Sequence, residues 1–166
     1  MSQETTYFSC TKQEFDRLFQ GWHPGEPDQT MLPEEGPEYP SLDGIDHVVL
    51  YNFGSPRIEN LLGVAVGDTV NTPNGFATHP SLEAFVFLLT TESVEKLASF
   101  ADVQLLLDGF IQAERKDAAT ISNEFARNSA INTANHDEWR QPVHQLHAIS
   151  KRATENKLPL YLFWTL

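Results

Sequence analysis

Apolar positions along this chain follow two different spacings, one typical of strands and one typical of helices. Alternating or continuous apolar runs, rich in β-branched and aromatic residues, predict four strands. These runs are TYFSC near the start, IDHVVLYNF after residue 44, LEAFVFLL near residue 85 and LPLYLFWTL at the end. The last run is apolar at successive positions, so it predicts a central strand buried on both faces.

Helical spacing appears between these runs. Thr11 and Glu14 stand at the spacing of a capping box and open a helix over TKQEFDRLF. The segment ADVQLLLDGFIQAERK has apolar residues three and four positions apart, which predicts an amphipathic helix. TTESVEKLASF and DAATISNEFARNSA indicate two further helices. Residues 57–67 favour a short helix after Ser55 and Pro56, with a strand from Leu61 as the alternative.

The last helix follows from the stretch HDEWRQPVHQLH and its continuation to Asn156. Its apolar positions again have helical spacing, but Pro142 lies within them. Proline lacks the amide proton that a helix interior uses, so we expect the regular helix to begin near Gln141 or to kink there. The pattern as a whole predicts one domain over residues 1–166. Its fold class is α/β or α+β, with a mixed sheet of about four strands, four to five helices, and the C-terminal strand at the centre.

Two stretches lack either spacing and are predicted to be loops. GDTVNTPNGFATHP is one of them. The other, residues 21–44, holds five prolines and four glycines, together with apolar side chains that would pin it to the domain. Long loops in compact domains are often functional. Two interpretations remain open. The segment is either a loop that binds a partner or a solvated surface loop that its aromatic residues hold to the domain. In the binding interpretation, the partner-binding residues are Trp22, Glu26, Asp28, Glu34, Glu35, Glu38 and Tyr39.

Charge narrows the class of partner. The 166 residues contain 23 acidic and 11 basic side chains, for a net charge of −12. Fourteen of the acids but two of the bases lie between Glu26 and Asp108, so the acidity is concentrated in one part of the chain. Such a surface repels phosphate backbones, which argues against nucleic acid, and attracts basic proteins. Acidity that serves solubility alone is the competing explanation.

Composition also bears on location and redox chemistry. No apolar run is long enough to cross a bilayer, and the first residues, MSQETTYFSC, do not resemble a secretory signal. Cys10 is the single cysteine, so no internal disulfide can form. We therefore expect a cytoplasmic protein that has no membrane contact.

Candidate chemistry is concentrated around three histidines. His144 and His147 would share a helix face, and His136 or Glu138 are the nearby candidates for a third metal ligand. The set is incomplete and its spacing matches no zinc motif, so we expect neither a metal nor a cofactor. LDGIDH is interpreted as a turn before a strand rather than an acid–base cluster. Motifs for nucleophilic catalysis or nucleotide binding do not occur, and no catalytic residue is assigned.

Several short segments resemble the YfbM-like family of small, uncharacterised bacterial proteins. They are YFSCTKQEFDRLF, LDGIDHVVLYNFG, ENLLGVAVGD, FLLTTESVEKLASF and ISKRATENKLPLYLFW, which together span most of the chain. The family has no established activity, so the resemblance implies no catalytic residue. At the level of class, the small, acidic, single-domain chain resembles bacterial toxin-immunity proteins. The hypothesis is therefore a non-enzymatic protein that binds and neutralises a basic protein partner, such as a cognate toxin. The alternative is a small-molecule-binding domain or a hydrolase whose pocket has no sequence signature.

Overall fold

An antiparallel sheet of six strands forms the centre of the computed structural model, which describes residues 4–28, 30–66 and 74–166. The strand order is β2-β4-β5-β6-β1-β3, and each neighbouring pair is antiparallel. The strands are β1 (Glu4–Ser9), β2 (His23–Pro24), β3 (Asp46–Tyr51), β4 (Asn74–Thr78), β5 (Ala84–Leu88) and β6 (Leu160–Thr165).

Side chains of the middle strands are buried on both faces of this sheet. In β1, Tyr7 and Phe8 are adjacent in sequence, point to opposite faces and are both fully buried. In β6, Tyr161 and Leu162 do the same. β6 pairs with β5 on one side and β1 on the other, so the C-terminal strand is interior as expected.

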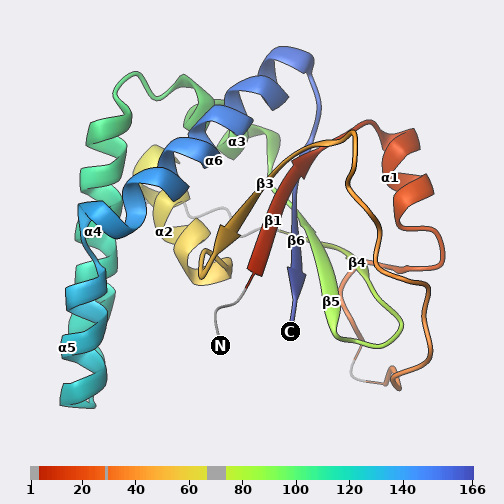
Figure 1. Ribbon diagram of the computed structural model, residues 1–166, viewed down its shortest axis with the longest axis horizontal. Coiled ribbons are helices and arrows are strands. Elements are labelled where there is room, and N and C mark those ends of the chain that lie inside the picture. Colours follow the sequence, from red (N-terminus) through yellow and green to blue (C-terminus); the bar gives the residue numbers. More distant parts are fainter. Residues whose placement is uncertain (1–3, 29, 67–73) are drawn as a thin grey trace.

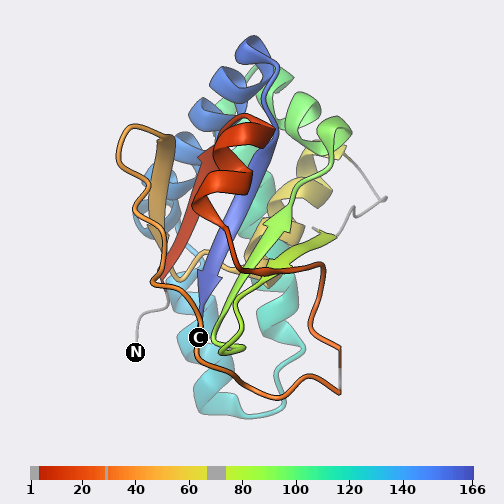
Figure 2. The ribbon, with the colours of Figure 1, turned by 90° about the vertical axis from the view of Figure 1, so that its right-hand side faces the viewer.

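Six helices within the described residues cover the two faces unequally (Figure 1). The larger core packs between one face of the sheet and the helices α2, α3, α4 and α6. The opposite face carries α1 and the loop 21–44, which cross it in Figure 2. The helices are α1 (Lys12–Leu18), α2 (Ser55–Val66), α3 (Thr91–Ser99), α4 (Val103–Ala119), α5 (Glu124–Thr133) and α6 (His136–Asn156).

The sheet corrects the predicted fold in two respects. It is antiparallel throughout rather than mixed, which makes the fold α+β and rules out α/β. It also has two strands more than the four expected. One, β2, is two residues long and contains Pro24, inside the loop 21–44. The other, β4, lies in the second predicted loop, where Gly75 and a β-bulge between Gly75 and Ala77 interrupt the alternation that marks a strand.

The helices also differ from the pattern at their ends. Residues 57–66 are helical, as favoured, and residues 67–73 lie outside the described part. The last helix begins at His136 and continues through Pro142, so the expected start near Gln141 is wrong. Asn135 explains the earlier start, because its side chain accepts a hydrogen bond from the Glu138 amide at 3.0 Å and caps the helix. In the described residues, no helix is both long and apolar enough to cross a membrane.

Candidate protein-binding surface

Aromatic contacts hold the start of the loop 21–44 in place. Trp22 is 9% exposed and belongs to the core of the face that carries α1. Its ring centroid lies 5.0 Å from Phe19, 5.9 Å from Phe163 and 4.9 Å from His79. Phe19 ends α1, Phe163 belongs to β6, and His79 follows β4. Trp22 therefore fixes the loop to three separate elements.

His79 fixes the middle of the loop. Its Nδ1 accepts a hydrogen bond from the Ser81 amide at 3.1 Å, which leaves the proton of the neutral ring on Nε2. Nε2 then donates to the carbonyl oxygen of Pro37 at 2.7 Å. Gly36 lies so close that a Cβ added there would overlap the His79 ring. Glycine is therefore required at position 36 for the loop to approach the histidine.

Five acidic side chains project from the anchored loop into solvent: Glu26, Asp28, Glu34, Glu35 and Glu38. Among the described residues, none of the five lies within ion-pair distance of a basic group. Glu26 accepts a hydrogen bond from the Gly75 amide at 3.3 Å, and Asp28 accepts one from the Thr30 amide at 3.0 Å. These five acids, with the partly exposed Tyr39, form what we call the acidic loop surface.

The two aromatic residues assigned to this surface from sequence have different positions. Tyr39 is 45% exposed, and its ring packs on His79 with centroids 5.0 Å apart. It can therefore contact a partner directly. Trp22 is buried, so it is not a surface anchor; its contribution is to hold the loop in place.

A hollow of about 490 Å³ lies beside the loop, between α1 and β4. Aromatic side chains line it, and the exposed ion pair of Lys12 and Asp16, 2.6 Å apart, lies at its rim. The aromatic lining consists of Phe15, Phe19, Trp22 and Phe76. An apolar hollow of this size is a candidate site for a small molecule or for one side chain of a protein.

The three histidines of α6 lie in different surroundings. His136 Nε2 lies 2.6 Å from Asp108 of α4, and this hydrogen bond is the main cause of the lowered pKa of Asp108. His147 Nε2 lies 3.1 Å from the carbonyl oxygen of Phe100, and burial lowers the pKa of this histidine. His144 is exposed. In the part of the chain that the structure describes, no three candidate ligands gather into a possible metal site.

Cys10 and LDGIDH, the other groups considered from the sequence, have structural roles: one lies in the core and the other forms a turn. Cys10 is 1% exposed just after β1, and burial, followed by the charge of Glu14, raises the pKa of its thiol to about 11. LDGIDH does form a turn before β3, in which Gly44 has a φ of 80°. Asp46, the fifth residue of this motif and the first of β3, forms two hydrogen bonds of 2.8 and 2.9 Å with Arg152 of α6.

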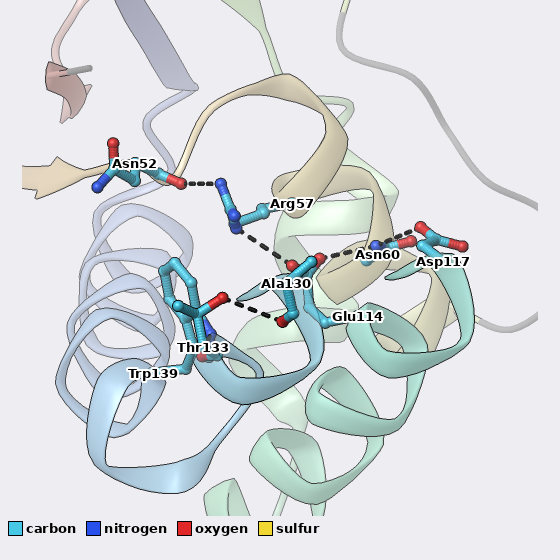
Figure 3. Close-up of polar contacts among 8 residues, drawn as sticks. All are labelled: Asn52, Arg57, Asn60, Glu114, Asp117, Ala130, Thr133 and Trp139. Atoms are coloured by element: carbon cyan, nitrogen blue, oxygen red, sulfur yellow. Dashed lines mark hydrogen bonds and ion pairs between the residues drawn. The ribbon is translucent and has the colours of Figure 1, made fainter. Parts of the chain in front are cut away.

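Sequence reasoning missed a polar cluster around Arg57 on the helical side (Figure 3). The Arg57 guanidinium donates to Glu114 of α4 at 3.1 Å and to the carbonyl oxygen of Asn52, and lies 4.7 Å from the centre of the Trp139 ring. Asn60 donates to both Glu114 and Asp117 at 2.8 Å. The side-chain partners on α4 are more than 50 positions from Arg57 and Asn60 along the chain, so no local motif signals them. The cluster borders a hollow of about 380 Å³ between α2, α4 and α5.

Fold and surface together define a small α+β domain whose one sheet face is covered by a short helix and an anchored acidic loop. Compared with known protein families, curated proteins and solved structures, the chain matches none.

Proposed function

We propose that this chain is a protein-binding protein that engages a basic partner through the acidic loop surface. The observation that carries the proposal is that five exposed acids, without ion-pair partners among the described residues, project from a loop that Trp22 and His79 hold in place. Basic side chains would be attracted from a distance, which raises the association rate.

The anchoring supports binding over mere solubility. A solubilising surface needs charge but no fixed geometry, whereas a binding loop gains affinity when its conformation is set before the partner arrives. Here a buried tryptophan, a histidine with a defined tautomer and a glycine without room for a side chain all constrain one loop. Tyr39 supplies a partly exposed ring beside the acids, the kind of residue that contributes strongly to interfaces.

The specific function we propose is that of a cytoplasmic immunity protein, which neutralises a basic bacterial toxin by direct binding and without catalysis. A toxin that acts on nucleic acid needs a basic surface where it binds the phosphates. An acidic loop of fixed shape would compete for that same basic surface. The YfbM-like resemblance remains part of this proposal as a statement of family and adds no activity.

The test is to capture a partner by co-purification from the source cell or by co-expression with the neighbouring gene, and then to measure binding rates. In the test variant, Glu26, Asp28, Glu34, Glu35 and Glu38 become their amides. The control variant changes the same amount of charge on the helical side, at Glu92, Glu95, Glu124, Asp137 and Glu155, which are also exposed.

The loop variant should associate at least about tenfold more slowly at low salt, and its rate should depend less on salt. Its melting temperature should stay near that of the parent, because exposed charges contribute little to stability. The control variant should keep most of the rate and most of the salt dependence. Tyr39→Ala should mainly speed dissociation, and Tyr39→Phe should restore it. An acidic partner, or equal rates for the loop and control variants, would contradict the proposal.

The alternative is a small-molecule-binding domain or hydrolase, and the aromatic hollow between α1 and β4 is the observation that favours it. In that case no protein partner would be captured. Small aromatic or apolar compounds would instead raise the melting temperature, and Phe76→Ala, which changes a partly exposed lining residue, would remove the effect.

A further inference from the structure

The two edge strands of the sheet, β2 and β3, differ in the features that prevent pairing with another strand. At one edge, β2 is two residues long and contains Pro24, which cannot donate a hydrogen bond. Beyond β2, the Gly25 amide bonds to the Phe76 carbonyl oxygen at 2.8 Å, and the Glu26 carboxylate accepts from the Gly75 amide. A β-bulge distorts β4 at the same place. Short strands, prolines, bulges and side-chain caps are the devices by which proteins prevent edge pairing.

The opposite edge, β3, has none of these devices. It pairs with β1 over six consecutive residues without a register shift, and it contains neither proline nor lysine. Every second residue of an outer strand turns its amide and carbonyl groups away from the sheet. Among the described residues, no hydrogen bond from another segment reaches the outward groups of β3. The protein thus leaves open a six-residue template for another strand.

Most side chains of this edge are apolar, in a chain that is acidic overall. Residues 47–51, HVVLY, carry no acid, although the chain as a whole has a net charge of −12. Val49 is 37% exposed and Tyr51 is 59% exposed, on the sheet face opposite to α6. The nearest acid in the strand, Asp46, is bound to Arg152. A second copy of the chain could therefore approach this edge without placing two acids opposite each other.

We propose that two copies of the chain pair through their β3 strands to form one continuous sheet. The strands run antiparallel, and the two-fold axis lies midway between the two Val49 residues. Residues directly opposite each other in such a pair lie on the same face of the sheet. The residue at the centre of the pairing must therefore lie opposite its own copy, and not opposite its neighbour in sequence. Centring on Val49 places it against itself and sets Tyr51 against His47 of the second copy. Val48 then faces Leu50 of the second copy, and Asp46 stays outside the pairing.

The surroundings of β3 suit this arrangement. A groove of about 330 Å³ runs beside the strand, between Val49, Leu50 and Tyr51 and the α6 residues Glu138, Trp139, Gln141, Pro142 and Gln145. Side chains on the helix-covered face of the second copy's strand would lie along this groove. β3 contains none of the residues of the acidic loop surface, so pairing through β3 does not depend on the proposed function.

The register can be tested by cysteine cross-linking. In the proposed pair the two Val49 Cα atoms would be about 4.5–5.5 Å apart, within the range that a disulfide spans. Tyr51 is the matched control, because it is exposed on the same face of the strand and its two copies would be offset by four residues and lie more than about 10 Å apart. Native Cys10 is 1% exposed and should not contribute. Under mild oxidation Val49→Cys should form a covalent dimer readily, and Tyr51→Cys should not.

Sedimentation equilibrium of the unmodified chain tests the pairing itself. The parent should be dimeric at about 100 μM, a concentration at which a micromolar complex is almost fully formed. Val49→Lys should be monomeric, since two lysines would face each other at the axis. Leu32→Lys, at a loop residue that is 79% exposed, should remain dimeric. Three results would overturn the proposal: a monomeric parent, a dimeric Val49→Lys variant, or cross-linking of Tyr51→Cys at least as fast as that of Val49→Cys.

Discussion

Replacing Trp139 with alanine should cause a large loss of stability, because this side chain joins the helical core to the Arg57 cluster. Trp139 is 3% exposed, and its ring makes edge contacts with Phe53 at 5.8 Å and Phe110 at 5.9 Å. Its indole Nε1 donates to the Thr133 carbonyl oxygen at 2.8 Å. One face of the ring receives the Arg57 guanidinium. Alanine removes all of these interactions at once.

The magnitude follows from the buried area. A tryptophan buries about 150–250 Å², which at about 25 cal/mol per Å² corresponds to about 4–6 kcal/mol. That is an upper bound, since unfolded chains already bury part of this surface. We therefore expect a loss of about 3–5 kcal/mol in the free energy of unfolding, as for other buried tryptophans. For a chain of this size, the melting temperature should fall by about 2–4 °C for each kcal/mol.

Urea unfolding followed by far-ultraviolet circular dichroism measures this loss without relying on tryptophan fluorescence. The control is Phe125→Ala in α5, since Phe125 is 86% exposed and its replacement should change stability by less than about 0.5 kcal/mol. Arg57→Ala should be destabilising too, because the Glu114 carboxylate, 13% exposed, loses its basic partner and keeps only the hydrogen bond from Asn60. Its effect should not add fully to that of Trp139→Ala. A Trp139→Ala variant within about 1 kcal/mol of the parent would refute the assigned packing.

Three further predictions concern single groups or a single strand. Cys10 should react with a thiol reagent at pH 8 only on unfolding, since burial and the charge of Glu14 raise its pKa to about 11; fast labelling of the native protein would contradict this. Burial lowers the pKa of His147, so the unfolded chain binds a proton here more readily than the folded one, and stability should decrease as pH falls below about 6.5. Unfolding curves near pH 7 and pH 5.5 should show a smaller decrease for His147→Gln than for the parent. Deleting β6 should prevent cooperative folding, because that strand pairs on both sides; a truncated chain with a sharp thermal transition would disprove this.

Much of the fold could be predicted from local sequence patterns. The continuous apolar run at residues 160–164 marks an interior strand because both faces of β6 require apolar cover. The capping box at Thr11 and Glu14 forms as expected, with the Thr11 amide donating to the Glu14 carboxylate at 2.7 Å. Such signals lie in residues close together in sequence, so they can be recognised without knowledge of distant contacts.

The missed elements depend on distant parts of the chain. β2 and β4 have too few alternating residues to be recognised, and they exist because they pair with each other and with β5. The strand directions could not be read from the sequence either. Helices between strands are compatible with parallel crossovers, and the antiparallel arrangement is visible only in the register of the pairs.

For the candidate site, the sequence indicated the acids but not what holds them. Composition alone identifies residues 21–44 as an acidic, proline-rich loop, and exposure of its carboxylates follows from their charge. The anchoring by His79 could not be predicted, because the histidine lies 42 positions beyond its acceptor, Pro37, in a segment that itself looks like a loop. Trp22 was interpreted as a surface anchor because an aromatic residue among prolines has no periodicity to show which side it faces.

Because of these contacts, the shape of the loop depends on the strands that it packs against and not only on the loop's own sequence. His79 is held by Ser81 in the turn between β4 and β5, and Trp22 packs on Phe163 of β6. A substitution in either strand can therefore displace the acids without touching them. Charge sets how strongly a basic partner is attracted, whereas the sheet sets where the charges stand. Sequence changes that keep the net charge but alter Gly36 or His79 should for this reason impair binding more than the loss of any single acid.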